Sequence, residues 1–371
     1  MGIFSGDIIC LSPRDIEYMN DALSFLKVSE SNFSELAPGL SELHGAIFNK
    51  KYELSCLKSR YFNSPVGKNN LIVAVRRGRV VGEYGLLYIP LVVRGELIVV
   101  GFMSCIAICP SERSWQCYRG LVDKSIVESQ EDNLAFWLGL CFYEMIDFNQ
   151  RMGVRVLGRM SVYFGFLNVS RILEGRSIPY PLSLSGCVVQ PIVGLKMTGK
   201  KICDLDIRVI EIFDSAFDEL WRDVVKNREV SVVKNAAYLK WRYIDFPGKQ
   251  YGRLAAYYNN RLEGFVVFSS TGIRYSSIIF ELLVRDDNPG IMRELLLQVF
   301  HELKMQKVGS ITASFSPGSP EAVVLQELGF KLWATEALPA HIVITASSPK
   351  EVCPDISMDS CRFSFGDWNL L

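Results

Sequence analysis

LKSRYFNSPVGKNNLIVAVRRGRVVG, residues Leu57–Gly82, aligns without a gap with LKWRYIDFPGKQYGRLAAYYNNRLEG, residues Leu239–Gly264, at a constant offset of 182. Eight of the 26 aligned pairs are identical: Leu57/Leu239, Lys58/Lys240, Arg60/Arg242, Tyr61/Tyr243, Pro65/Pro247, Ala74/Ala256, Arg79/Arg261 and Gly82/Gly264. Unrelated segments of ordinary composition would share about two. Twice the offset nearly equals the 371-residue length, so we infer two copies of one domain laid end to end.

The bulk composition is that of a folded globular protein. Apolar residues make up 49% of the chain and charged residues 22%, with 40 basic and 40 acidic side chains in balance. A dedicated nucleic-acid binder usually shows a basic surplus, so we expect no nucleic-acid partner. Residues 1–12 lack the regions of a signal peptide, and the longest apolar run, Leu97–Pro110, is too short to span a bilayer. We therefore expect a cytoplasmic protein without a membrane segment.

The cysteines and histidines do not form a recognisable metal motif. Ten cysteines include no CxxC pair, and the three histidines are His44, His301 and His341. Zinc sites usually use closely spaced Cys or His pairs, so we predict no metal. Cys105 and Cys109 are expected to face the same way from one strand, and we interpret them as small core thiols.

Each copy carries the same order of expected elements. Turn residues between two apolar runs predict a hairpin at Arg77–Gly78 and another at Asn259–Asn260. The remaining elements are an opening helix (Pro13–Leu26; Phe217–Val225), a long strand (Glu96–Ile108; Ser276–Val284), a helix (Leu134–Met152; Ile291–Met305) and a strand (Val154–Leu157; Ser310–Ala313), with a helix at Glu321–Leu328 and a strand at His341–Thr345 in the second copy. This order predicts an α+β fold with a mixed, mostly antiparallel sheet flanked by helices.

This order, the YLKWRY…P…G stretch and the LQELGF segment resemble the GNAT N-acyltransferase superfamily, in a tandem form found in bacterial polysaccharide and natural-product gene clusters. The resemblance implies two GNAT-like domains, at residues 1–195 and 206–348, followed by a tail at 349–371. The first domain is 26 residues longer between corresponding glycines, which we interpret as an inserted loop at residues 107–133.

In GNAT proteins a Q/R-x-x-G-x-G/A loop after the fourth strand cradles the pyrophosphate of coenzyme A. The matching stretch is CPSERSWQCYRG, Cys109–Gly120, in which Ser114 and Gln116 stand where glycines are expected. The resemblance implies a cofactor, acetyl-CoA or another acyl-CoA, held by Ile108, Cys109, Arg113, Ser114, Gln116, Arg119 and Gly120. The alternative is a solvated loop packed by its own aromatic side chains.

The corresponding segment of the second copy, Arg285–Gly290, argues against a cofactor there. Asp286 and Asp287 would repel a pyrophosphate, while Asn288 can cap the helix that Pro289 begins. We therefore expect the second domain to lack cofactor.

Acyl transfer to an amine needs a proton acceptor and a donor for the leaving thiolate. By resemblance, Tyr163 is the candidate acid and Glu281 the candidate base or substrate clamp; the alternative for Glu281 is a solvent-facing strand position. The leading hypothesis is an N-acyltransferase that moves an acyl group from acyl-CoA, or from a carrier-protein thioester, to an amine of a small molecule or sugar. The alternatives are an aminoacyl transferase resembling the peptidoglycan-bridge ligases and a non-catalytic tandem GNAT interaction protein.

Overall fold

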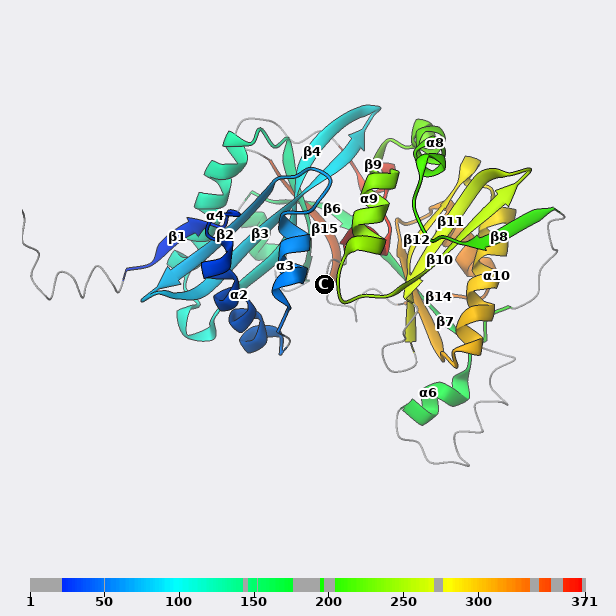
Figure 1. Ribbon diagram of the computed structural model, residues 1–371, viewed down its shortest axis with the longest axis horizontal. Helices are drawn as coiled ribbons and strands as arrows, with labels where there is room; N and C mark the ends of the chain where they lie inside the picture. Colours follow the sequence, from blue (N-terminus) through cyan, green and yellow to red (C-terminus); the bar gives the residue numbers. More distant parts are fainter. Residues whose placement is uncertain are drawn as a thin grey trace, which may run out of the picture.

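A computed structural model describes residues 22–49, 51–142, 146–151, 153–175, 194–196, 204–269, 276–333, 340–347 and 356–368. Two lobes lie side by side, each built on a twisted sheet (Figure 1). The first sheet has the order β1 (Ser24–Lys27), β2 (Asn69–Arg76), β3 (Arg79–Val93), β4 (Glu96–Ile108), β5 (Phe136–Phe142), β15 (Ala340–Ser347) and β6 (Arg155–Arg159). The second has the order β8 (Leu205–Val209), β10 (Tyr251–Tyr258), β11 (Arg261–Ser269), β12 (Ser276–Val284), β13 (Ser310–Phe315), β7 (Ser161–Phe166) and β14 (Lys331–Leu332).

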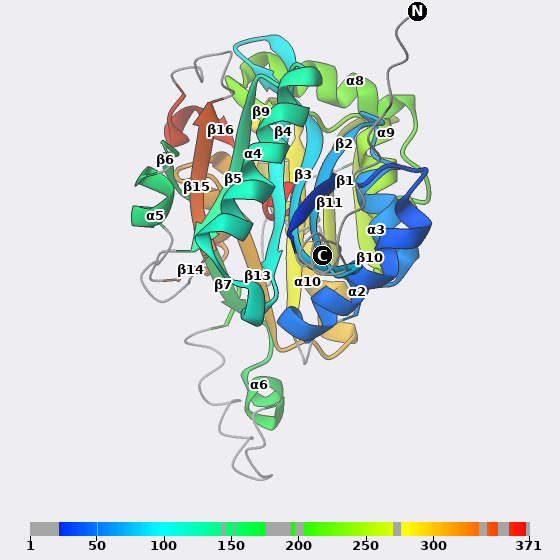
Figure 2. The same cartoon turned by 90° about the vertical axis from the view of Figure 1, so that its left-hand side faces the viewer.

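The two sheets exchange one strand each. In the first sheet β15, from the end of the chain, lies antiparallel between β5 and β6 (Figure 2). In the second sheet β7, which precedes the second repeat, lies between β13 and β14. The strand expected at His341–Thr345 is therefore present, but it completes the first sheet. The division at 195–206 stays a prediction, because no single cut in the chain separates the two sheets.

Helices cover both faces of each sheet in the same way. The first sheet carries α2 (Phe33–Phe48), α3 (Leu54–Tyr61), α4 (Trp115–Glu131) and α5 (Ile146–Arg151). The second carries α8 (Ser215–Val224), α9 (Ala236–Lys240), α10 (Pro289–Met305) and α11 (Pro320–Glu327); α6 (Val169–Gly175) follows β7. The LKWRY segment continues α9 as a π-helical turn, Trp241–Asp245. The two repeated segments meet in the middle of the molecule, where the indole Nε1 of Trp241 donates to the carbonyl of Ser59 at 2.9 Å.

The chain's last described segment lies between the lobes. The short strand β16 (Cys361–Arg362) pairs with β9 (Val230–Val232), which in turn pairs with β3. The helix α12 (Phe365–Trp368) follows, and the ring of Trp368 packs against Phe102 of β4 at 5.3 Å between centroids. The largest buried apolar cluster accordingly takes side chains from both halves and from this segment. The largest core cluster is therefore shared by the two halves.

Three sequence expectations need correction. Residues Ser24–Lys27 form a strand, although the opening helix was expected to extend through Leu26. The region expected as one helix at Leu134–Met152 contains β5 and the short α5, because its apolar run is a buried strand rather than a helix face. The inserted loop expected at 107–133 is mostly the 17-residue helix α4, which matches the 17-residue α10 of the second half. No insertion is present at residues 107–133. The counterpart of α10 is α4, and not the helix expected at Leu134–Met152.

Candidate functional site

The two repeats build the same scaffold beneath each sheet. Helices α3 and α9 begin after N-cap residues Glu53 and Asn235, which are 182 residues apart. The hydroxyl of Tyr61 donates to Glu83 Oε1 at 3.1 Å, and that of Tyr243 donates to Glu281 Oε1 at 2.6 Å. In each half the repeated tyrosine therefore donates to a buried carboxylate. The pKa values of both tyrosines are strongly raised, because burial disfavours the phenolate.

A bulge in the fourth strand of each half lies beside this pair. In β4 the extra residue is Ser104, since Gly85 faces Cys105 while Leu86 faces Met103. In β12 the extra residue is Phe280, since Val267 faces Glu281 while Phe268 faces Ile279. Because Gly85 and Val267 are also 182 residues apart, the register makes Cys105 the counterpart of Glu281.

The strands diverge at the bulges. The parallel pairing of β4 with β5 ends at Met103 and Gly139, and that of β12 with β13 ends at Ile279 and Ala313. Beyond these residues each fourth strand continues without its neighbour. We call the stretch where each fourth strand has lost its parallel partner the opening of that half; it lies next to the tyrosine–carboxylate pair.

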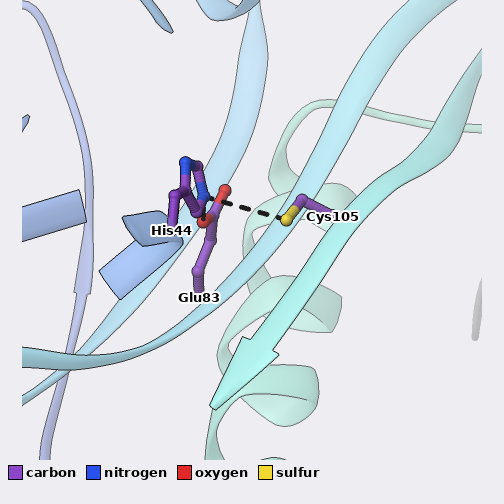
Figure 3. A group of neighbouring side chains, drawn as sticks. All are labelled: His44, Glu83 and Cys105. Carbon is purple, nitrogen blue, oxygen red and sulfur yellow. Dashed lines mark hydrogen bonds and ion pairs between the residues drawn. The ribbon is translucent and has the colours of Figure 1, made fainter. Parts of the chain in front are cut away.

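In the first half the carboxylate comes from β3 and is shared with a histidine. Glu83 Oε2 forms a short hydrogen bond with His44 Nε2, and His44 reaches it from α2 (Figure 3). Both side chains are fully buried. The edge of the Tyr52 ring packs on His44 at 5.2 Å between centroids. An acid, a histidine and a tyrosine hydroxyl therefore form one hydrogen-bonded chain under the bulge, which is an arrangement that can accept and pass a proton.

Cys105 adds a thiol to this group. Its Sγ lies 3.9 Å from His44 Nε2, and the sulfur, nitrogen and carboxylate oxygen all lie within 4.8 Å of one another. Donors of these types can hold zinc, yet His44 and Glu83 already bind each other. Burial and the Glu83 charge raise the pKa of Cys105 well above its usual range, so the group is a thiol. Sulfur and carboxylate contact the same ring nitrogen, whereas a nucleophilic triad uses both nitrogens.

Arg60 completes the first half's cluster. Its guanidinium is 1% exposed, lies over the Tyr61 ring and donates from Nη2 to the carbonyl of Ser104 at 2.7 Å. The Nε and Nη1 atoms are buried and have no hydrogen-bond partner among the described residues. The Ser104 carbonyl at the bulge thus accepts a hydrogen bond from Arg60, whose Nε and Nη1 make none within the described residues.

The second half contains a lysine amine at the equivalent place. Lys234 Nζ lies 2.7 Å from Glu281 Oε1 and 3.3 Å from Ser364 Oγ, and it also pairs with Asp367. Burial alone would lower the pKa of Lys234, but the two carboxylates raise it above its usual value. Desolvation in turn raises the pKa of Glu281. Position 234 corresponds to Tyr52 in the first half, which therefore has the carboxylate but no built-in cation.

The C-terminal segment fills the second opening. The amide of Ser316 donates to the carbonyl of Phe363 at 3.1 Å, and the amide of Phe363 donates to Ser316 Oγ at 2.9 Å. Arg242 donates from Nε and Nη2 to the carbonyl of Gly366 at 3.2 and 3.0 Å. The cavity left beside Lys234 has a volume of about 10 Å³, which is room for one water molecule.

The predicted cofactor segment forms a strand-to-helix turn in the first half. Half-buried Ile108 and Cys109 end β4, a 3₁₀ turn spans Pro110–Glu112, and the Ser114 hydroxyl caps α4 by accepting from the amide of Cys117 at 3.2 Å. A 17-residue helix with an exposed N-terminus is suited to an anion, because its first amides have no partners within the helix.

The side chains predicted to bind the cofactor around that turn do not all lie in one place. Arg113 and Gln116 are exposed at the start of α4, and Arg113 Nε donates to the carbonyl of Ile108 at 3.2 Å. Arg119 pairs with Asp123 one turn later. Gly120 faces the Phe25 ring, which a side chain there would strike, so its smallness serves the packing of α4 on β1. The structure brings Arg113, Ser114 and Gln116 together and places Gly120 on another face.

The two predicted catalytic residues lie outside the first half's cluster. Tyr163 is on β7, 2% exposed, in the apolar core of the second sheet. Glu281 lies in the buried Lys234 network rather than on a solvent-facing strand surface. In the same half, Arg285 pairs with Asp223, and Asn288 caps α10 by accepting from two amides, as expected.

Sequence reasoning missed the residues that make the first half's cluster. Glu83 has no counterpart at the repeat offset, His44 was one histidine among three, and Arg60 was interpreted as a residue of the fold. One signal was available: extending the alignment five residues upstream pairs Tyr52 with Lys234 and shows that the copies differ in charge there.

The chain has the GNAT fold, present twice in tandem. No family model matches the sequence, and no curated protein matches it. The solved structures with the same fold include N-acyltransferases that share 11–13% identity with this chain.

Three of these structures illustrate the range. A tandem GNAT protein from the clavulanic acid biosynthesis pathway shares 13% identity over 88% of this chain and 99% of its own, with a TM-score of 0.56. N-myristoyltransferase from Saccharomyces cerevisiae, solved with bound myristoyl-CoA, shares 11% identity over 89% and 86%, with a TM-score of 0.62. A GCN5-related N-acetyltransferase from Anabaena variabilis shares 11% over 89% and 74%, with a TM-score of 0.60. Among the described residues, no helix is both long and apolar enough to cross a membrane.

Proposed function

We propose that the protein is an N-acyltransferase that moves an acyl group from a thioester, acyl-CoA or an acyl carrier, to a primary amine in its first half. The observation that carries the proposal is the Lys234 amine in the second half. It lies on the carboxylate of a tyrosine–carboxylate pair beside a strand bulge. In the first half the repeated tyrosine, Tyr61, binds a carboxylate from a different strand, Glu83, and Tyr52 stands at the position of Lys234. An amine from a substrate would take the corresponding position.

The residues present fit a thioester in the first half better than in the second. Beyond its pairing with β5, β4 runs through the turn at Pro110–Glu112 into the exposed N-terminus of α4, with Arg113 and Gln116 beside it. In the second half the C-terminal segment fills the opening, and Asp286 and Asp287 occupy the turn before α10. A thioester supplies an activated carbonyl carbon and a thiolate leaving group. Arg113, Ser114, Gln116 and the first amides of α4 would hold its phosphates.

The protein's own groups then handle the proton of the amine. An ammonium that binds Glu83 gives its proton to the Glu83–His44 pair, and the free amine forms the new C–N bond as the C–S bond breaks. The proton released from the amine ends on the departing thiolate, so the products are an amide and a thiol. Tyr61 holds the carboxylate in place through its hydrogen bond to Oε1.

Two measurements test this function. Saturating acetyl-CoA or a longer acyl-CoA should raise the melting temperature, because a ligand at a hundred times its Kd adds about 2.7 kcal/mol. Glu83→Gln should keep that shift but lower turnover by about 10²- to 10⁴-fold, the usual contribution of a general base. Glu42→Gln, which changes an exposed carboxylate on the same helix as His44, is the control. Absence of any thioester shift would favour the non-catalytic interaction protein.

A further inference from the structure

Arg60 and Arg242 occupy equivalent positions of the repeat but are used differently. Arg242 directs Nε and Nη2 to a single oxygen, the carbonyl of Gly366 in the C-terminal segment. Arg60 uses Nη2 on the carbonyl of Ser104, and its Nε and Nη1 have no hydrogen-bond partner among the described residues. Its side chain is 1% exposed. Buried donors without acceptors are rare and costly in native proteins, so these two N–H groups call for an acceptor that is not part of the described chain.

The second half shows what such an acceptor looks like. There the Lys234 amine binds Glu281, and the Gly366 carbonyl binds Arg242. Gly366 itself packs directly on the Tyr243 hydroxyl and the Glu281 carboxylate, where a side chain would strike both. An amine and a carbonyl therefore lie on either side of one tyrosine–carboxylate pair, both supplied by the chain.

We propose that the acceptor substrate of the first half is an amine with a neighbouring carbonyl oxygen, and that Arg60 Nε binds that oxygen, as Arg242 Nε binds the Gly366 carbonyl, while Glu83 binds the amine. The proposal rests on the acyl-transfer function above and names the class of its acceptor. The oxygen can belong to an amide, as in an aminoacyl amide or a peptide, or to the carboxylate of an amino acid. The Nε–H group of Arg60 can donate to either kind of oxygen, and a carboxylate would add the attraction of its charge.

Tyr52 is the side chain that has to move for such a substrate to enter. It stands at the position of Lys234, is half-buried, and packs its ring edge on His44. Its counterpart in the second half, Lys234, reaches the Glu281 carboxylate. Displacement of the Tyr52 ring would therefore open the path that the Lys234 side chain follows in the second half.

The experiment observes the two arginines directly in the full-length protein. Side-chain Nε–H signals of ¹⁵N-labelled protein are assigned with R60K and R242K, and coenzyme A is present throughout. Glycinamide, glycine and ethylamine are then titrated as matched amines with an amide, a carboxylate or no carbonyl. We expect a saturable shift of the Arg60 signal with glycinamide or glycine, and none with ethylamine. The Arg242 signal, which already has its carbonyl, is the internal control and should not move.

The outcomes separate the two alternatives and the failures. A shift with glycinamide alone indicates an amide substrate, and one with glycine alone an amino acid. The proposal is overturned if no probe shifts Arg60, if ethylamine shifts it equally, or if Arg242 moves with it. In turnover assays R60K should raise the KM for the carbonyl-bearing amine at least tenfold more than it raises the KM for ethylamine. If no thioester binds, the acyl-transfer function fails, whereas the Arg60 signal still reports on the carbonyl.

Discussion

The Lys234 site of the second half and the Glu83 site of the first half differ in what fills them. Both contain the repeated tyrosine, a buried carboxylate and a strand bulge. In the second half a lysine binds the carboxylate, and the C-terminal segment accepts from Nε and Nη2 of the arginine. In the first half Tyr52 replaces the lysine, and two N–H groups of Arg60 remain without a partner among the described residues. The comparison indicates that one copy has become a structural support while the other retains a place for a ligand.

The exchanged strands explain how one copy can lose its opening without loss of the fold. β15 completes the first sheet and the C-terminal segment closes the second, so residues 340–347 and 356–368 serve both halves. The apolar core crosses between the lobes. Closing the second opening therefore contributes to the stability of the whole chain, and the predictions below test that division of roles.

The largest effect is expected from Lys234→Met. This change leaves the buried carboxylates of Glu281 and Asp367 without their cation, which typically costs about 3–5 kcal/mol. Urea denaturation would measure the loss of unfolding free energy. Lys240→Met, which removes an exposed partner of Asp245, should cost under about 1 kcal/mol.

The same variant gives a prediction for pH. Desolvation raises the pKa of Glu281, and Lys234 opposes that shift. Without the lysine the folded-state pKa rises further, so stability is retained at low pH and lost as pH rises through that pKa. The deficit of Lys234→Met should therefore shrink toward pH 4.5. A deficit that is small at neutral pH would show that the lysine does not secure the second half.

Gly366→Ala is expected to have the next largest effect. The added methyl group would strike the Tyr243 hydroxyl and the Glu281 carboxylate, both fully buried, and overpacking of this kind costs about 1–3 kcal/mol. Gly45→Ala is the control, because its nearest neighbour is the flexible Lys51 side chain and alanine favours a helix by about 0.5–1 kcal/mol. Equal melting temperatures for the two variants would mean that the C-terminal segment is not tightly held.

The sequence predicted the scaffold well because the scaffold is local. Turn residues and alternating apolar residues located the hairpins at Arg77–Gly78 and Asn259–Asn260, and the bounds of β4 and β12 agree with the predicted ones. The strand exchange could not be predicted, because β15 carries the same apolar pattern whichever sheet it joins. The helix α4 was missed because its apolar face is narrow between polar residues.

The site was harder to predict than the fold. His44, Glu83 and Cys105 come from three elements, and nothing in their spacing indicates that they meet. Glu281 was predicted as a base or substrate clamp or as a solvent-facing strand residue, and its burial could not be foreseen because its lysine partner lies 47 residues away and its serine partner 83 residues away. Contacts between distant segments depend on the register of the sheets, which hydrophobic patterns do not fix.

Tyr52→Lys would make the first half resemble the second. A lysine at this position should reach Glu83 as Lys234 reaches Glu281, and its ammonium would compete with the acceptor amine. We expect the acceptor KM to rise at least tenfold, about 1.4 kcal/mol, while the thioester melting shift is unchanged. The control is Tyr52→Met, because a methionine side chain is similar in length to lysine but carries no charge. If both variants behave alike, the amine position assigned from Lys234 is wrong.

The smallest effect is expected at Glu128, which contrasts an exposed ion cluster with the buried one. Glu128 of α4 pairs with Lys27 at 2.7 Å and with Lys124 at 2.8 Å, and both lysines are about a third exposed. Partial burial opposes the charge of Glu128, but the two lysines lower its pKa below the usual value. A lowered folded-state pKa contributes stability above the unfolded value, about 4.3, that is lost as pH falls through the folded one.

Glu128→Gln should cost about 0.2–1 kcal/mol at neutral pH. The cost should decline in 1 M salt, where screening acts within about 3 Å, and decline further as pH falls through the lowered pKa of Glu128. The Lys234→Met deficit should keep its size in salt, because its charges are buried. Equal salt sensitivity of the two variants would contradict the contrast between an open first half and a sealed second half.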